Sequence, residues 1–159
     1  MPIPILMNFV DNTDLLSPYM LWGNSFISKI SQIVNICESS QNLMIGIYLI
    51  EKNRFLFCNY KLKEILAESY NHFLRDGWDF WYSLVNPNEK ASIKNLITTF
   101  CTYPYSQNQL TVKYHITDFH GNKICIKHEL LLHQLERHFV AISYFFDDSE
   151  KERVEHCFE

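Results

Sequence analysis

Histidine is the side chain best suited to acid–base or ligand chemistry near neutral pH, and this chain has seven. His128 differs from the others because it alternates onto the apolar face of an expected strand. Its neighbours on that face are Ile124, Ile126 and Leu130. One interpretation is a hydrogen-bonded core histidine, and the other is a polar contact to a bound ligand. His115 and His133 alternate onto polar strand faces instead.

Motifs of common enzyme chemistry do not occur in the sequence. There is no H-E-x-x-H metal motif, no G-x-S-x-G nucleophile motif, and no phosphate-binding or dinucleotide-binding glycine loop. Asp76 and Asp79 lie beside two tryptophans, but turn and helix-start positions account for these carboxylates. We therefore expect no catalytic residues and no enzyme activity.

The cysteines point to a reducing compartment. The chain has five, which is an odd number, and none of them forms a C-x-x-C pair. They are Cys37, Cys58, Cys101, Cys125 and Cys157. This spacing favours reduced thiols over disulfides or a zinc site, so the sequence predicts a cytoplasmic chain with no metal site.

Aromatic residues are dense between Phe73 and Tyr82, and they could face aromatic residues of the strands across an apolar pocket. The candidate pocket residues are Tyr48, Phe57, Phe80, Trp81, Tyr114, Ile126, His128 and Tyr144. A solid aromatic core is the alternative. The sequence names no ligand, so a small molecule bound in this pocket would be unidentified.

Composition limits the possible partners. The 159 residues are 47% hydrophobic and 20% charged, with a net charge of −4, as in a single globular domain. The acidic balance, with a pI near 6.0, argues against direct binding of nucleic acid or an anionic membrane. There is no signal-peptide pattern and no apolar run of membrane-spanning length.

Three strands are expected near the C-terminus. Apolar and polar residues alternate over 109–117 and 123–133, and a mainly apolar run follows over 138–146. A turn containing Gly121 and Asn122 separates the first two, so the three form an antiparallel meander. The last strand is apolar on both faces, which implies a cover on each face of the sheet. We expect helices on one side and a helix or second subunit on the other.

Helical periodicity occurs in three places before that meander. Residues 1–16 form an irregular arm, Ser17-Pro18 starts a short turn, and a helix over 24–38 carries an apolar stripe. The stripe includes Phe26, Ile27, Ile30 and Val34. It predicts either a core helix or the outer cover of the sheet, and two subunits of a homodimer could share that cover.

A hairpin over 43–58 follows, and Asn59 is expected to cap a short helix over 60–67. A longer amphipathic helix covers 88–102. At the C-terminus, Ser149 and Glu152 form a capping box that starts a last helix. Val154 and Phe158 make a narrow apolar stripe on that helix, which could dimerise or pass a signal onward.

Four segments, taken in order, resemble the PAS sensor family over roughly residues 40–150. Residues 45–66 (IGIYLIEKNRFLFCNYKLKEIL) look like the opening hairpin and first helix of that family, and 84–93 (LVNPNEKASI) are similar to the segment before its long helix. Residues 116–132 (ITDFHGNKICIKHELLL) resemble its glycine-containing hairpin. Residues 138–151 (HFVAISYFFDDSEK) resemble its last strand and exit, although the usual Asp-x-Thr has become Asp147-Asp148-Ser149.

The resemblance implies an α+β fold with a five-stranded antiparallel sheet, helices on one face and an extra N-terminal helix. The opening hairpin would then lie beside the last strand. The expected divisions are an arm and helix over 1–40, the PAS-like domain over 41–148 and the start of a signalling helix over 149–159.

The function implied is a sensory and dimerisation module that relays small-molecule or partner binding to an output domain outside this segment. A DNA-binding output of the LuxR type is favoured over a histidine kinase. The alternative is a small enzyme or ligand carrier with a cone-shaped fold of helices and sheet. The Asn-Cys-Arg-Phe-Leu-Gln run of the flavin-binding branch is missing, and 88–102 lack the histidine of the haem-binding branch, so no cofactor is expected.

Overall fold

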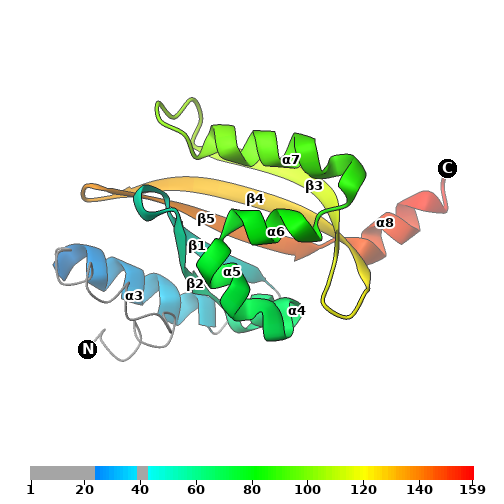
Figure 1. Cartoon of the computed structure of the whole chain (residues 1–159), viewed down its shortest axis with the longest axis horizontal. Helices are drawn as coiled ribbons and strands as arrows, with labels where there is room; N and C mark the ends of the chain where they lie inside the picture. The colour runs from blue at the N-terminus through cyan, green and yellow to red at the C-terminus, as the bar shows by residue number, and fades with distance from the viewer. Residues whose placement is uncertain (1–23, 39–42) are drawn as a thin grey trace.

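A computed structural model describes residues 24–38 and 43–159 (Figure 1). The expected arm over 1–16, the turn at Ser17-Pro18 and residues 39–40 lie outside the described part. The helices are α3 (Asn24–Glu38), α4 (Tyr60–Leu66), α5 (Tyr70–Asp76), α6 (Trp78–Leu84), α7 (Pro87–Phe100) and α8 (Ser149–His156), with single 3-10 turns η1 (Ile50–Lys52) and η2 (Ala67–Ser69). The strands are β1 (Met44–Leu49), β2 (Arg54–Cys58), β3 (Gln109–Thr117), β4 (Lys123–Leu135) and β5 (His138–Asp147). None of these helices is both long and apolar enough to cross a membrane.

The sheet has the order β2-β1-β5-β4-β3, and each neighbouring pair is antiparallel. The predicted meander is therefore confirmed, and so is the placement of the opening hairpin beside the last strand. The strand β4 runs two residues further than the expected 123–133, because the turn to β5 forms at Glu136, which adopts a φ of 57°. The α+β fold class is thus as predicted.

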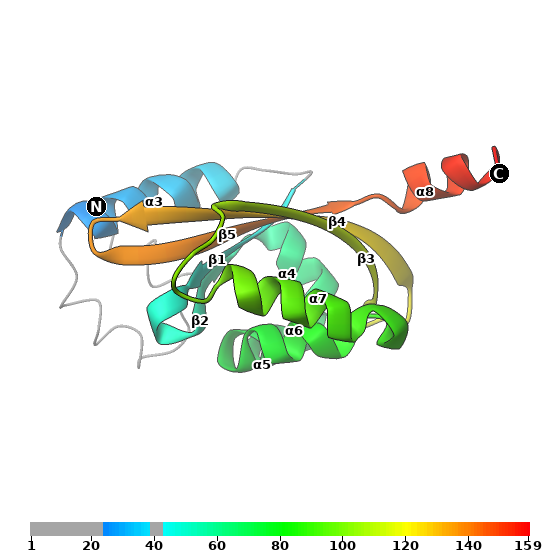
Figure 2. The same ribbon diagram turned by 90° about the horizontal axis from the view of Figure 1, so that it is seen from above.

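Helices cover both faces of the sheet at its β1–β5 side (Figure 2). The inner face, covered by α4 to α7, holds the larger core, which includes Tyr48, Trp81, Tyr114 and Phe145. The outer face of β1, β2 and β5 is covered by α3. This helix supplies the second cover that the doubly apolar β5 required.

The apolar stripe of α3 is used inside the chain. Its residues Phe26, Ile27, Ile30 and Val34 are 1%, 6%, 1% and 2% exposed and pack on the outer face of the chain's own sheet. Of the two interpretations left open by the sequence, the structure has the outer cover of the sheet, formed within one chain. Because these four side chains are buried against the chain's own sheet, they are not exposed to a second subunit.

A β-bulge in β2 changes which residues share a face. Ile47 pairs with Phe57, but the next residue, Tyr48, pairs with Phe55, so Leu56 is an extra residue in the ladder. As a result Phe55 packs in the inner core, whereas Leu56 and Phe57 both pack under α3. The expectation that Phe57 lines the same pocket as Tyr48 is wrong for this reason.

The end of α4 holds a strained residue. Ala67 has φ 47° and ψ −124°, a conformation that glycine adopts far more easily than alanine. Removing strain of about 1–3 kcal/mol should outweigh the extra chain entropy of about 0.5–1 kcal/mol. We therefore expect Ala67→Gly to raise the free energy of unfolding by about 1 kcal/mol in urea titrations.

The matched control is Ala91→Gly, an exposed position inside α7. This change should lower the free energy of unfolding by about 1 kcal/mol, because glycine is a poor helix former. Destabilisation by both changes would show that Ala67 is not strained.

Candidate functional site

A chain of hydrogen bonds crosses the inner core from a helix to three strands. Trp81 Nε1 of α6 donates to the Tyr114 hydroxyl of β3 at 2.8 Å, and that hydroxyl lies 2.8 Å from His128 Nδ1 of β4. His128 Nε2 is 3.0 Å from Ser143 Oγ of β5. Trp81 and His128 and Ser143 are all 0% exposed. The helical layer and the sheet are therefore joined through a buried polar network.

The direction of this network follows from its first donor. Trp81 can only donate, so the Tyr114 hydroxyl accepts from it and uses its own hydrogen toward His128 Nδ1. His128 is then the neutral Nε2–H tautomer, which donates to Ser143. Burial lowers the pKa of His128 to about 3, and burial raises the pKa of Tyr114, so both stay uncharged.

Aromatic rings fill the space around the network. The Phe145 ring stacks on His128 with centroids 4.2 Å apart, and the Trp81 ring is 4.7 Å from Phe145. A cleft of about 220 Å³ lies between η1, α6 and α7, and its lining includes Tyr48, Trp78, Asp79, Lys94 and Thr98. The indole N–H of Trp78 is buried and has no hydrogen-bond partner among the described residues.

The predicted pocket residues do not all meet. Five of them, Tyr48, Trp81, Tyr114, Ile126 and His128, belong to the inner side of the sheet or the helical layer facing it. Phe80 is half-buried at the edge of that layer, near the ring of His72. Tyr144 packs against the cluster under α3, as Phe57 does. Strand alternation puts Tyr144 on the face opposite Phe145, so its assignment to the pocket is corrected.

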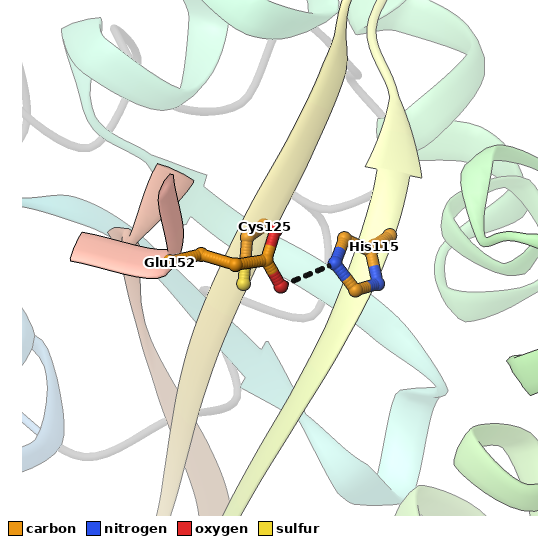
Figure 3. Close-up of side chains that lie close together, drawn as sticks. All are labelled: His115, Cys125 and Glu152. Atoms are coloured by element: carbon orange, nitrogen blue, oxygen red, sulfur yellow. Dashed lines mark hydrogen bonds and ion pairs between the residues drawn. The ribbon is translucent and has the colours of Figure 1, made fainter. Parts of the chain in front are cut away.

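A second cluster lies on the outer face, where α8 leaves the sheet (Figure 3). His115 of β3 and Cys125 of β4 are cross-strand partners in the antiparallel ladder. Glu152 of α8 reaches over them, and its Oε2 lies 2.7 Å from His115 Nε2. The ligand-type atoms of these three side chains all lie within 4.8 Å of one another.

Glu89 holds the other side of the imidazole. One of its oxygens, Oε1, lies 3.1 Å from His115 Nδ1 and also accepts the backbone N–H of His115 at 3.0 Å. Burial lowers the pKa of His115, but the hydrogen bonds to Glu152 and Glu89 outweigh it and raise the pKa overall. The hydrogen bond to His115 lowers the pKa of Glu152. Burial and the neighbouring Glu152 carboxylate raise the pKa of Cys125 to about 11.

The helix α8 does not begin as the capping box predicts. Asp148 is its N-cap residue, and the Ser149 hydroxyl accepts the backbone N–H of Cys125 at 2.9 Å. Glu152 turns to His115, so both residues of the expected box tie the helix to the sheet instead. Beyond them α8 has no buried residue, and its Val154 is 55% exposed. Phe158 of the expected stripe lies past the helix end at His156 and is 86% exposed. The helix extends past the end of the sheet in both views (Figures 1 and 2).

The fold that carries these sites is that of PAS domains. No family model matches the sequence, and no curated protein is significantly similar to it. Solved structures do match it. The N-terminal domain of a diguanylate cyclase with a PAS/PAC sensor from Marinobacter aquaeolei has a TM-score of 0.55 and 11% identity, over 69% of this chain and 98% of that one.

Two further structures agree with this fold. The PAS domain of an HTR-like protein from Haloarcula marismortui has a TM-score of 0.54 and 12% identity, over 76% of this chain and 97% of that one. A LOV protein of Rhodobacter sphaeroides has a TM-score of 0.59 and 10% identity, over 76% of this chain and 67% of that one. The predicted PAS resemblance is thereby confirmed at the level of the fold.

Proposed function

We propose that this chain is a PAS sensory module that passes a change in its sheet to a following segment through α8. The observation that carries the proposal is the attachment of this helix. Glu152 and Ser149 bind α8 to adjacent strands, β3 and β4, while the rest of the helix is solvent-exposed. A shift between those strands would therefore change the position of α8.

The names of similar structures support a signalling role. They include the diguanylate cyclase above, a two-component sensor histidine kinase and a sensory box histidine kinase/response regulator. None of these three names describes a LuxR-type regulator, and we do not propose that output type. An output domain after α8, with or without DNA binding, remains a proposal for the full-length protein.

Input by a small molecule is part of the proposal. The cleft beside η1 offers a buried donor, Trp78 Nε1, for which the described residues supply no partner, together with the Asp79 carboxylate and the Lys94 ammonium. A homodimer is also part of it, through the exposed stripe of Val154 and Phe158. A helix of this length does not persist alone in water, so pairing with a second copy would stabilise it.

The test is a chimaera in which residues 1–156 replace the PAS domain of a PAS-controlled histidine kinase, with α8 in register with the kinase's own helix. We expect Glu152→Ala to change kinase autophosphorylation about tenfold. The substitution releases α8 from β3, and a change of this size is typical of allosteric coupling between two sites. Autophosphorylation with labelled ATP is the measurement.

Glu150→Ala is the matched control, since Glu150 lies on the same helix and is exposed. It should leave autophosphorylation as in the unmodified chimaera. Equal activity in the chimaeras with Glu152→Ala, with Glu150→Ala and with neither change would contradict a relay through α8.

A further inference from the structure

We propose that His115, Cys125 and Glu152 form a binding site for a thiophilic divalent metal ion, with Zn²⁺ the best fit. Imidazole nitrogen, thiolate sulfur and carboxylate oxygen are the usual zinc ligands. Their atoms lie within 4.8 Å of one another here (Figure 3). Ligand atoms around tetrahedral zinc are about 3.3–3.8 Å apart, so a side-chain rotation of Glu152 and a small contraction would suffice.

The backbone already fixes two of the three ligands. His115 and Cys125 are directly opposed across β3 and β4, and both point to the outer face. A cross-strand pair holds its side chains about 5 Å apart without loops that must first become ordered. Only Glu152 comes from another element, and α8 brings it over that pair.

Glu89 has the geometry of a second-shell partner. A metal-bound histidine normally donates its other ring N–H to a carboxylate, which fixes the tautomer and the ring orientation. Glu89 Oε1 is 3.1 Å from Nδ1, whereas Nε2 lies 2.7 Å from Glu152 Oε2, so Nε2 is the nitrogen that faces another member of the cluster. Metal binding would replace the Nε2 proton and the thiol proton, and both would pass to solvent.

The cluster opens into a small hollow of about 110 Å³, which gives an ion a way in. Asp148 and Glu155 also line it. The Oδ2 atom of Asp148 is buried and accepts no hydrogen bond from the described residues, although the Lys113 ammonium is 3.4 Å away. Asp148 or a water molecule could complete four ligands. The carboxylates outnumber Lys113 and His115 around this hollow, so its charge suits a cation.

Ligand softness selects the metal class. A thiolate and an imidazole disfavour Mg²⁺ and Ca²⁺, which prefer oxygen ligands, and favour Zn²⁺ and related ions. Two of the ligands belong to the sheet and one belongs to α8. A bound ion would therefore fix the position of α8 relative to the strands. That the ion is also the input detected by the module rests on the function proposed above.

The experiment uses the chain with Cys157→Ser, which removes the exposed thiol beside His156 as a competing site. Titration with Co²⁺, a spectroscopic substitute for Zn²⁺, should give the near-ultraviolet thiolate-to-cobalt charge-transfer band with one ion per chain. Added Zn²⁺ should remove the band and raise the melting temperature, because it binds the folded state.

Variants in this background assign the ligands. Cys125→Ser should abolish the band, and Glu152→Gln, on an exposed helix that the fold does not require, should weaken Zn²⁺ binding at least about tenfold. Glu150→Gln should bind as the parent does. No thiolate band in the parent, or the same band after Cys125→Ser, would overturn the site. Because binding is measured on this chain alone, either result leaves the relay through α8 to be decided by the kinase chimaera.

Discussion

Replacing Asn59 with alanine should lower the free energy of unfolding by about 3–5 kcal/mol, because several buried backbone groups lose their partner together. Asn59 is 0% exposed. Its side-chain oxygen accepts from Ile45 N at 3.0 Å and from Leu62 N at 3.3 Å. Its amide donates to Leu43 O at 2.7 Å and to Cys37 O at 3.4 Å. This one side chain joins α3, β1 and α4, and urea unfolding monitored by circular dichroism measures the loss.

Asn86 provides the control, since it caps α7 as Asn59 caps α4 but makes a single exposed side-chain bond to Asn88 N. Asn86→Ala should lose only about 1 kcal/mol, the usual value for an exposed cap. Losses of similar size in the two variants would mean that the bonds of Asn59 to α3 and β1 contribute nothing.

The second large effect concerns acid and His128. Its pKa is about 3 in the folded chain and near 6.5 in the unfolded chain, so below pH 6.5 the unfolded state binds a proton that the folded state does not. Stability is therefore fully present above pH 6.5 and falls as the pH drops toward 3. Each pH unit in that window corresponds to about 1.4 kcal/mol, which gives a loss of about 2–3 kcal/mol by pH 4.5.

The variant His128→Asn removes this titration and keeps an acceptor for the Tyr114 hydroxyl. It should be about 1–3 kcal/mol less stable than the parent at pH 7, because Ser143 loses its donor. Between pH 6.5 and 4.5 its free energy of unfolding should fall less steeply. Chemical denaturation at a series of pH values measures both quantities.

His133→Asn controls for the removal of a histidine from the same strand, because His133 is exposed on β4. Its pH dependence should match that of the parent. If His128→Asn also keeps the full slope, then His128 is not held neutral by burial in the folded chain.

Much of the fold could be predicted because period-two alternation survives in the long strands. The alternating residues of β3 and β4 placed Tyr114, Ile126 and His128 on one face, and the structure agrees. Asn59 could be predicted as a cap from its position between a strand and a helix. These are local signals, in which each residue's neighbours along the chain settle its role.

Features that depend on distant contacts could not be predicted. The bulge at Leu56 is set by pairing with β1, and it reversed the face of Phe57. The capping-box pattern was misleading at Ser149, because a tertiary acceptor role toward Cys125 N replaced the local one. The cluster of His115, Cys125 and Glu152 needed the strand register and the direction of α8 together. A histidine and a cysteine on the polar face of adjacent expected strands were its only signal in the sequence.

The uneven covering of the sheet has a mechanical consequence. The strands β1, β2 and β5 lie between two hydrophobic layers. Among the described residues, no layer like that of α3 covers the outer faces of β3 and β4, which bear residues such as Lys113, Lys127 and Glu129. We therefore expect the half of the sheet formed by β1, β2 and β5 to be stiffer than the half formed by β3 and β4. The helix α8 follows β5, which belongs to the stiffer half, and its Glu152 contacts His115 of β3 in the other half. If the two halves twist relative to each other, the relay proposed above predicts that α8 changes its direction.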